Sequence, residues 1–383
     1  MKKIKSPIVV CFIMLFFIIS FFSCESNKIE EINIGYIGPL SVRATDLGIA
    51  PSNAMILAVE QYNANRTENE PKVNLYIEDD KWDKENAIPS YKKLREEHNI
   101  EILFISNTDG TVAVQNEILK DKVILVNPLN NDKLLSSLNN NTFKIAKSTE
   151  EANGLIGIRL IELGHKKVAL FNYPNDFMTR GANEVKRILD EKNIKIEIIT
   201  IEKENVNFTD QLKVLQKNNY DAYVFFGYES LGFAMKQARD LGIKAPFYGS
   251  TVLLNPDFYN NSEGAIVNSE FPFFTPADGN YILANEFLIA YETMFSKKPA
   301  SVWPPMQAYD AMNLVLSQLR TINESKKDNE SFDDWLRTKL YRVNHYQGVC
   351  GNIAIKENGA SKGIYFSLYQ YNSKENPLIK IKR

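Results

Sequence analysis

The stretch that decides the fold is residues 32–40, INIGYIGPL, followed after a loop by residues 54–63, AMILAVEQYN. The first piece is an apolar run that ends in Gly-Pro, which predicts a buried β-strand leading into a turn. In the second piece, apolar residues recur at the spacing of one helical face: Met55, Ala58, Val59 and Tyr62. The two pieces together predict a strand followed by a helix.

The same rhythm continues along the chain. Further strands are predicted at residues 73–77, 101–105, 123–126, 167–171, 194–201 and 222–226, with helical stretches between them. Alternating strands and helices predict parallel sheets with right-handed crossovers. The rhythm occurs in two blocks, before and after about Lys147, and 383 residues are too many for one ordinary core. We therefore expect two α/β domains.

The N-terminus has the layout of a secretory signal. Three lysines precede an apolar run from Ile8 to Phe22, and Ser23-Cys24 closes it. This run is shorter than the ~20 apolar residues that a membrane-spanning helix needs. We expect a signal peptide over residues 1–23, a lipidated Cys24 and a linker over residues 24–30. An uncleaved anchor helix is the alternative, and both place the body outside the cytoplasm, tethered to a membrane.

Composition and charge exclude several functions. The formal net charge is −2, and the three lysines of the expected signal contribute +3, so the body carries −5 and has no basic excess for nucleic acid. No phosphate loop, dinucleotide fingerprint or Gly-x-Ser-x-Gly elbow occurs, and the three histidines are widely scattered. We expect no cofactor, no metal and no catalytic constellation. Glu78-Asp79-Asp80 is interpreted as a solvated strand end, and Cys350 as a small buried residue without a disulfide.

Several segments resemble the Leu/Ile/Val-type periplasmic binding proteins. Gly38-Pro39-Leu40 and the helix at residues 54–63 resemble the opening of that family. Other segments match in the same order: residues 78–80, 123–128, 208–215, 221–228, 235–246, 291–310 and 351–359. The resemblance extends over nearly the whole chain after Cys24, and the protein is identified as a member of this family, in lipoprotein form.

The resemblance implies an architecture of two doubly wound, Rossmann-like parallel-sheet domains with a ligand cleft between them, at the carboxyl ends of the strands. Three chain crossings are expected, near residues 143–149, 271–275 and 364–367. The expected lobes are residues 31–147 plus 276–364, and residues 148–275 plus 365–383.

The resemblance also implies partners. Closure around a small polar ligand would let the lipoprotein dock on the membrane permease of an ATP-driven importer. The permease supplies the transport energy, so the protein is expected to be a monomer that needs no nucleotide site.

Four candidate ligand contacts lie in the first lobe. Thr108 keeps a hydroxyl with which amino-acid binders of the family hold the ligand carboxylate, and Asp109 lies beside it. Leu129 stands at a backbone-carbonyl position, and Asn131 replaces a second hydroxyl. A purely structural alternative exists for two of them, because Thr108 and Asn131 are also suited to cap helices that begin near Gly110 and Asp132.

Three candidates lie in the second lobe. Tyr228 keeps a tyrosine that lines the cleft in the family, and Phe177 stands where the family often has tyrosine. Thr251 stands where amino-acid binders carry a glutamate that pairs with the ligand ammonium, and a buried ammonium without an acid is costly. Either Asp109 or Glu229 takes over the ammonium, or the ligand is not an ordinary amino acid. The structural alternatives are a cleft wall for Tyr228 and a core position for Phe177.

Three functions follow in order of preference. The first is a receptor that delivers a small polar solute, an amino acid or a similar molecule, to a permease. The second is an envelope lipoprotein that uses the same fold for protein–protein regulation or scaffolding, which an exposed apolar patch on one lobe would favour. An envelope enzyme ranks last, because no paired base and nucleophile is visible.

Overall fold

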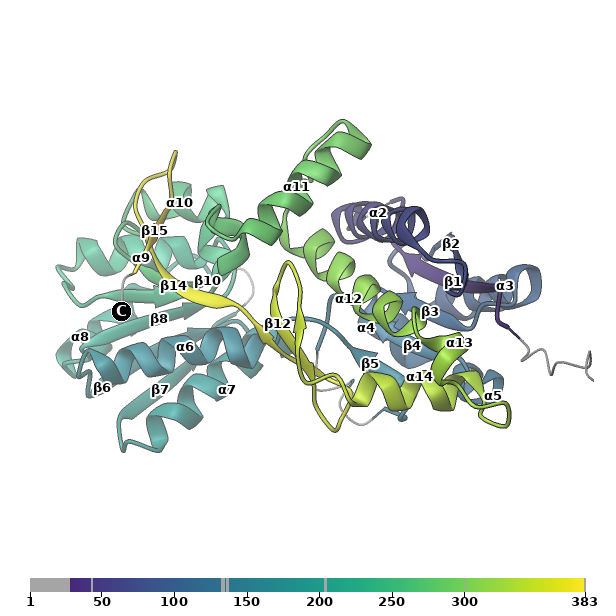
Figure 1. The fold of residues 1–383 in the computed structure, drawn as a ribbon. Coiled ribbons are helices and arrows are strands. Elements are labelled where there is room, and N and C mark those ends of the chain that lie inside the picture. Colours follow the sequence, from purple (N-terminus) through teal and green to yellow (C-terminus); the bar gives the residue numbers. More distant parts are fainter. Residues whose placement is uncertain are drawn as a thin grey trace, which may run out of the picture.

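The computed structural model describes residues 28–381, except residues 43, 132–134, 136–137, 203–204 and 300. Two lobes lie side by side and are joined by a narrow central region (Figure 1). Within the described part of the chain, no helix is long and apolar enough to cross a membrane. The expected signal and Cys24 lie outside the described residues.

The N-terminal lobe is built on a five-stranded parallel sheet with the order β2-β1-β3-β4-β5. Its strands are β1 (Glu31–Gly38), β2 (Lys72–Asp79), β3 (Ile102–Ile105), β4 (Ile124–Asn127) and β5 (Thr142–Lys144). The helices between them are α2 (Ile49–Asn65), α3 (Ala87–His98), α4 (Thr108–Ala113) and α5 (Gln115–Asp121). This order is that of a doubly wound sheet.

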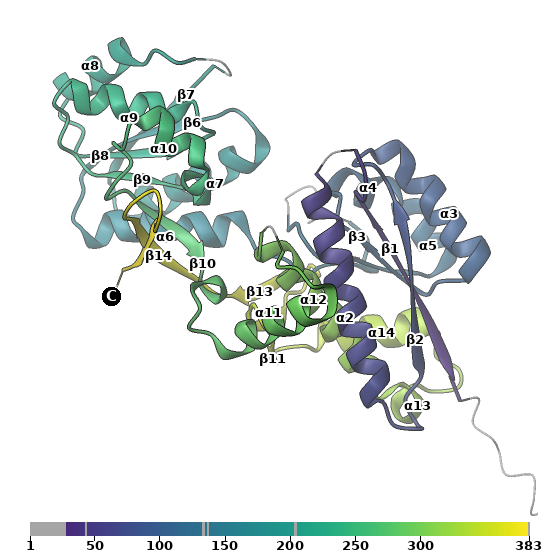
Figure 2. The same cartoon turned by 90° about the horizontal axis from the view of Figure 1, so that it is seen from above.

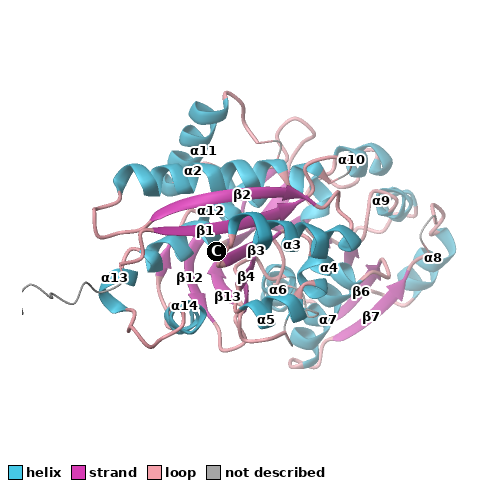
Figure 3. Ribbon diagram, turned by 90° about the vertical axis from the view of Figure 1, so that its right-hand side faces the viewer, coloured by secondary structure: helices cyan, strands magenta, loops and turns pink. Residues whose placement is uncertain are grey.

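Successive side chains of β3 pack on opposite faces of this sheet. Ile102 and Phe104 pack with the helices of one face, whereas Leu103 and Ile105 pack with α3 and α5 on the other. Figure 3 shows helices on both faces. At Gly35 of β1, a Cβ would lie only 2.7 Å from a methyl group of Ile100, so close packing of the neighbouring segment requires glycine there.

The C-terminal lobe repeats the same order in β7-β6-β8-β9-β10 and adds two strands. Its strands are β6 (Lys167–Asn172), β7 (Lys195–Thr200), β8 (Ala222–Phe226), β9 (Phe247–Gly249), β10 (Glu270–Phe274), β14 (Phe366–Tyr371) and β15 (Leu378–Lys380). Its helices are α6 (Thr149–Glu162), α7 (Asp176–Asp190), α8 (Thr209–Lys217), α9 (Leu231–Asp240) and α10 (Pro256–Ser262). The prediction of two doubly wound parallel-sheet domains is confirmed.

Three chain segments cross between the lobes, the number that the family resemblance implies (Figure 2). They are residues 145–148 between β5 and α6, residues 275–281 between β10 and α11, and residue 365 before β14. The sheet of the C-terminal lobe is not purely parallel, because β14 pairs antiparallel with β10. The third crossing enters the lobe from the carboxyl edge of its sheet, so the next strand must run in the opposite direction.

The segment between the second and third crossings packs on the N-terminal lobe. It contains α11 (Ile282–Phe295), α12 (Trp303–Leu319), α13 (Ile322–Ser325), α14 (Phe332–Tyr341), β11 (Tyr346–Gln347), β12 (Gly351–Ile355) and β13 (Ser361–Ile364). Its apolar residues join those of β1, β3 and β4 in one core. Cys350 is fully buried and free, as expected for a small core residue.

Candidate functional site

The predicted site residues lie on two sheet edges. Thr108, Leu129 and Asn131 follow β3 and β4 of the N-terminal lobe, whereas Tyr228 and Thr251 follow β8 and β9 of the C-terminal lobe. In doubly wound sheets, these carboxyl ends are the usual position of ligand sites. The three crossings leave from or arrive at the same edges, so the two sets of loops lie on either side of the hinge.

A buried polar network fixes the loops of the N-terminal edge. The hydroxyls of Tyr36 and Ser106 lie 2.7 Å apart, and Asn130 donates to the Ser106 carbonyl at 3.3 Å. Asn127 donates to the Thr111 hydroxyl at 2.9 Å and accepts from the backbone of Leu129 at 3.0 Å. Burial raises the pKa of Tyr36. These bonds hold the buried Leu129 and its neighbour Asn130 beside β3, and the half-buried Asn131 follows them in the chain.

The first turn of α4 is capped by Asn107, whose side chain accepts from the backbone N–H groups of Asp109 and Gly110 at 3.0 and 3.3 Å. The alternative that Thr108 caps this helix is therefore wrong, because Thr108 is already its first residue. Asp109 is exposed and lines a hollow of about 460 Å³ that only N-terminal-lobe residues form. The helix expected near Asp132 lies outside the described residues.

Asp79 and Asp80, at the end of β2, hold the loops that follow β1 and β2. Asp79 accepts from the backbone of Leu40 at 2.8 Å, and Asp80 accepts from the backbone of Trp82 at 2.8 Å. Asp80 is fully buried, and burial raises its pKa, so the expectation of a solvated strand end is wrong for this residue. Within the described residues, no group of three or more acidic, histidine or cysteine side chains is placed to hold a metal ion.

Tyr228 forms the centre of an aromatic corner at the C-terminal edge. Its ring meets that of Tyr173 edge to face with centroids 4.9 Å apart, and its hydroxyl accepts from Asn175 at 2.9 Å. Phe177 lies in the first turn of α7 and is 36 % exposed, so the alternative of a core position is wrong. The sequence analysis did not identify Tyr173 and Asn175, although both lie shortly after the strand predicted at residues 167–171.

Thr251 is half-buried and begins a short 3-10 helix (Thr251–Leu254) directly after β9. Ser250 caps that helix through its hydroxyl, which accepts from the backbone of Val252 at 3.4 Å. The cap of this helix is therefore Ser250 and not Thr251. The structure brings Tyr228 and Thr251 to the ends of the adjacent strands β8 and β9.

The hinge carries a cation that the sequence analysis did not single out. Lys147 lies in the first crossing, and its ammonium lies 3.7 Å from the ring centroid of Trp303 at the start of α12. Its backbone N–H donates to the side chain of Gln307. Burial lowers the pKa of Lys147 to about 8. No local sequence signal links Lys147 to Trp303, because the contact depends on the fold.

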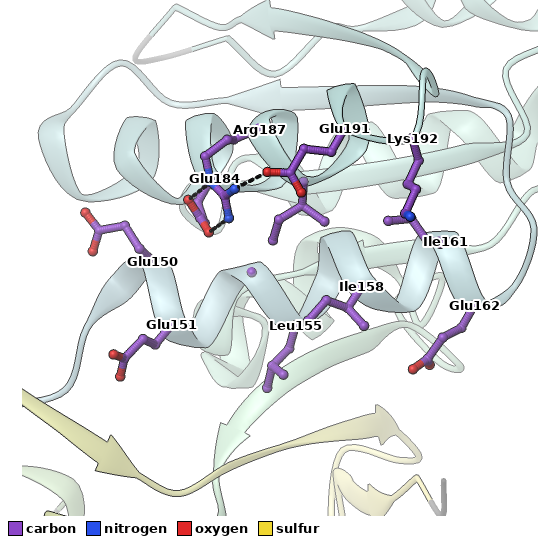
Figure 4. Close-up of a pocket in the computed structure, with 12 residues that line it drawn as sticks. Glu150, Glu151, Leu155, Ile158, Ile161, Glu162, Glu184, Arg187, Glu191 and Lys192 are labelled. Atoms are coloured by element: carbon purple, nitrogen blue, oxygen red, sulfur yellow. Dashed lines mark hydrogen bonds and ion pairs between the residues drawn. The ribbon is translucent and has the colours of Figure 1, made fainter. Parts of the chain in front are cut away.

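A second hollow, which we call the α6–α7 groove, has a volume of about 570 Å³ and lies between α6 and α7 of the C-terminal lobe (Figure 4). Leu155, Ile158 and Ile188 give it an apolar lining, and glutamates stand around it. Arg187 pairs with Glu184 and Glu191 at 2.7 and 2.5 Å, so part of the acidic charge is neutralised. None of the predicted ligand contacts lines this groove.

Comparisons with known proteins agree with this architecture. The family model described as "Periplasmic binding protein" matches residues 31–376. The protein belongs to this family. A leucine-, isoleucine-, valine-, threonine- and alanine-binding protein of Pseudomonas aeruginosa is 21% identical over 360 residues, 92% of each chain. Members of the family are extracytoplasmic binding proteins rather than enzymes.

Solved structures show the same fold. A putative branched-chain amino acid ABC transporter protein from Rhodospirillum rubrum superimposes with a TM-score of 0.78 at 17% identity, over 91% of this chain and 100% of that chain. A solute binding protein of an ABC transporter from Rhodopseudomonas palustris, in complex with 3,4-dihydroxybenzoic acid, gives a TM-score of 0.70 at 17% identity, over 92% and 96% of the chains. The prediction of a type I periplasmic binding fold is confirmed.

Proposed function

We propose that the protein is a solute receptor that binds a small polar molecule between its lobes and delivers it to the permease of an ATP-driven importer. One observation carries this proposal: two doubly wound sheets present their carboxyl edges on either side of three crossings. The receptor acts as a monomer and is tethered to the membrane by a lipid on Cys24. This tether keeps it close to the permease.

The ligand is an amino acid or an amino-acid-like molecule. The Pseudomonas relative is named for five amino acids, and the Rhodopseudomonas protein was solved with an aromatic acid. These ligands share a carboxylate. Thr108 and Asn131 offer side chains for polar groups of the ligand at the N-terminal edge, with Asp109 and Leu129 beside them. Tyr228, Phe177 and Thr251 face the ligand from the C-terminal edge.

A thermal-shift screen of the body, Glu25–Arg383, tests this proposal. The panel contains amino acids, small amides, carboxylates and short peptides, and a true ligand raises the melting temperature in proportion to the logarithm of its concentration. Small-angle scattering with the best ligand then reports whether the lobes close. A panel without any shift, or a ligand that leaves the scattering curve unchanged, contradicts a closing solute receptor.

The α6–α7 groove favours a second candidate function. Ile158 is 40 % exposed within this groove, and Leu155 and Ile188 lie beside it. An exposed apolar groove on one lobe suits contact with another envelope protein. This alternative predicts that Ile158→Glu abolishes co-purification of an envelope partner, while any solute binding is unchanged. If Ile158→Glu leaves co-purification intact, the scaffold function loses its support.

A further inference from the structure

Lys147 is a half-buried cation in the first crossing. Among the residues that the structure describes, no aspartate or glutamate forms an ion pair with its ammonium, which lies over the ring of Trp303. The ammonium groups of two nearby lysines have polar partners. Lys144 donates to the carbonyl of Asn358, and Lys356 pairs with Glu151 at 2.9 Å. Lys147 therefore stands out among the lysines near the hinge.

The position of this cation follows from the direction of the chain. Lys147 comes three residues after the carboxyl end of β5, on the edge where Thr108 and Asn131 also lie. Trp303, the first residue of α12, lies at the same edge because it contacts Lys147, and α12 ends near the opposite edge. There Asn323, just beyond α12, accepts from the backbone of Ile29 at 2.8 Å, directly before β1. The contact thus lies at the ligand edge of the N-terminal lobe.

One local side chain next to Lys147 offers an unused hydrogen-bond donor among the described residues. Gln307 is 1 % exposed and uses its side-chain oxygen for the backbone of Lys147, whereas its amide nitrogen has no partner among the described residues. Pro304 and Pro305 remove backbone N–H donors from the first turn of α12. The positive charge at this helix end therefore comes from the side chain of Lys147.

Holding this ammonium half-buried costs free energy, which an anion would offset. The lowered pKa of Lys147, to about 8, has burial as its only cause. A carboxylate bound to the ammonium forms a charge-assisted hydrogen bond, and the ring of Trp303 supports the apolar part beside it.

We propose that Lys147 and Trp303 form an anion-binding subsite at the first crossing, on the carboxyl edge of the N-terminal sheet, which takes the carboxylate of the ligand. This inference rests on the proposed solute receptor and narrows its ligand class. By the family resemblance, Thr251 stands where amino-acid binders carry a glutamate for the ammonium, so that position lacks an acid while Lys147 adds a cation. Together they select a small carboxylic acid without an α-ammonium, such as a 2-oxo acid or an aromatic acid.

The test compares acids with their uncharged amides by isothermal titration calorimetry. The probes are benzoate with benzamide, and 4-methyl-2-oxopentanoate with its amide and with L-leucine. The wild-type protein should bind an acid at least about tenfold more tightly than the matched amide. Lys147→Met should lose about tenfold or more for the acid and little for the amide, and Lys147→Arg should keep the preference. Melting temperatures establish that each variant is folded.

Other outcomes overturn the subsite. An equal loss for acid and amide in Lys147→Met assigns the residue a structural role in the hinge, and no loss shows that it does not touch the ligand. A wild-type protein that binds only L-leucine, or only amides, contradicts the anion subsite and leaves the solute receptor standing. If none of the probes and no solute of the wider screen binds, the proposed function fails and the subsite falls with it.

Discussion

Asn175 donates from its side-chain amide to the hydroxyl of Tyr228 at 2.9 Å, while its side-chain oxygen accepts from the backbone of Met178 at 2.8 Å. One residue thus caps α7 and orients the tyrosine that follows β8. The aromatic corner is fixed before any ligand arrives, which reduces the entropy lost on binding.

Tyr228→Ala is expected to weaken binding of an identified ligand by more than about tenfold, or roughly 1.4 kcal/mol. The side chain is 41 % exposed, so the melting temperature should change little. Tyr228→Phe is the matched control, because it keeps the ring contact with Tyr173 and loses only the hydroxyl. Calorimetric titration checks both variants, and an unchanged affinity of Tyr228→Ala would remove Tyr228 from the site.

Thr251→Glu is expected to gain affinity for L-leucine. The family resemblance implies a glutamate at this position as the partner of a ligand ammonium, and a nearby carboxylate favours the charged amine. Thr251→Gln is the isosteric control without charge. Titration with L-leucine should show a gain for the glutamate variant alone, and a gain in both variants, or in neither, contradicts the assignment.

Asn107 and Thr108 are neighbours with different predicted roles. Asn107→Ala removes the cap of α4 and should lower the free energy of unfolding by about 1 kcal/mol. Thr108→Ala keeps the cap of α4 and should weaken ligand binding. Chemical denaturation and titration of both variants separate the roles. Weaker ligand binding in Asn107→Ala but not in Thr108→Ala would contradict the assignment of Thr108.

Asp310 is expected to make stability depend on pH. It is buried and accepts from the backbone of Val349 and Cys350 at 2.8 and 2.7 Å, and burial raises its pKa from 3.8 to about 7. Between these two values the folded protein keeps a proton that the unfolded chain releases, so this group's contribution to stability falls as pH rises from about 4 to 7.

Asp310→Asn removes this titration. Its disadvantage in free energy of unfolding relative to the wild type should therefore be greatest near pH 4 to 5 and should shrink toward pH 7. Urea denaturation of both proteins across this range measures the difference. A difference that is constant with pH, or that grows toward pH 7, would show that the pKa of Asp310 is not raised in the folded state.

Much of the fold could be predicted from the sequence because its strands are short apolar runs. Residues 123–126 were expected as a strand, and β4 spans Ile124–Asn127. The antiparallel β14 was not foreseen, since its direction depends on where the third crossing enters the lobe. The buried state of Asp80 was also missed, because an acidic run at a strand end usually faces water.

The site was less predictable than the fold. Thr108 and Tyr228 follow predicted strands, but their assignment to the site came from the family resemblance and stays a prediction. The Lys147–Trp303 contact could not be predicted, because the two residues belong to different chain segments that only the packing of α12 beside α2 brings together. Likewise, Asn107 rather than Thr108 caps α4, and both residue types suit that position equally well by sequence.

Native mass spectrometry of the body, Glu25–Arg383, tests the central claim most directly. The protein is mixed with the solute panel at about 1 mM, a concentration at which even weak ligands of a binding protein are retained. One bound small molecule per monomer is expected, with a smaller bound fraction in the Tyr228→Ala variant once the ligand concentration is lowered toward its Kd. A clean mass of the unliganded chain across the whole panel would contradict the solute receptor and favour the protein-binding scaffold.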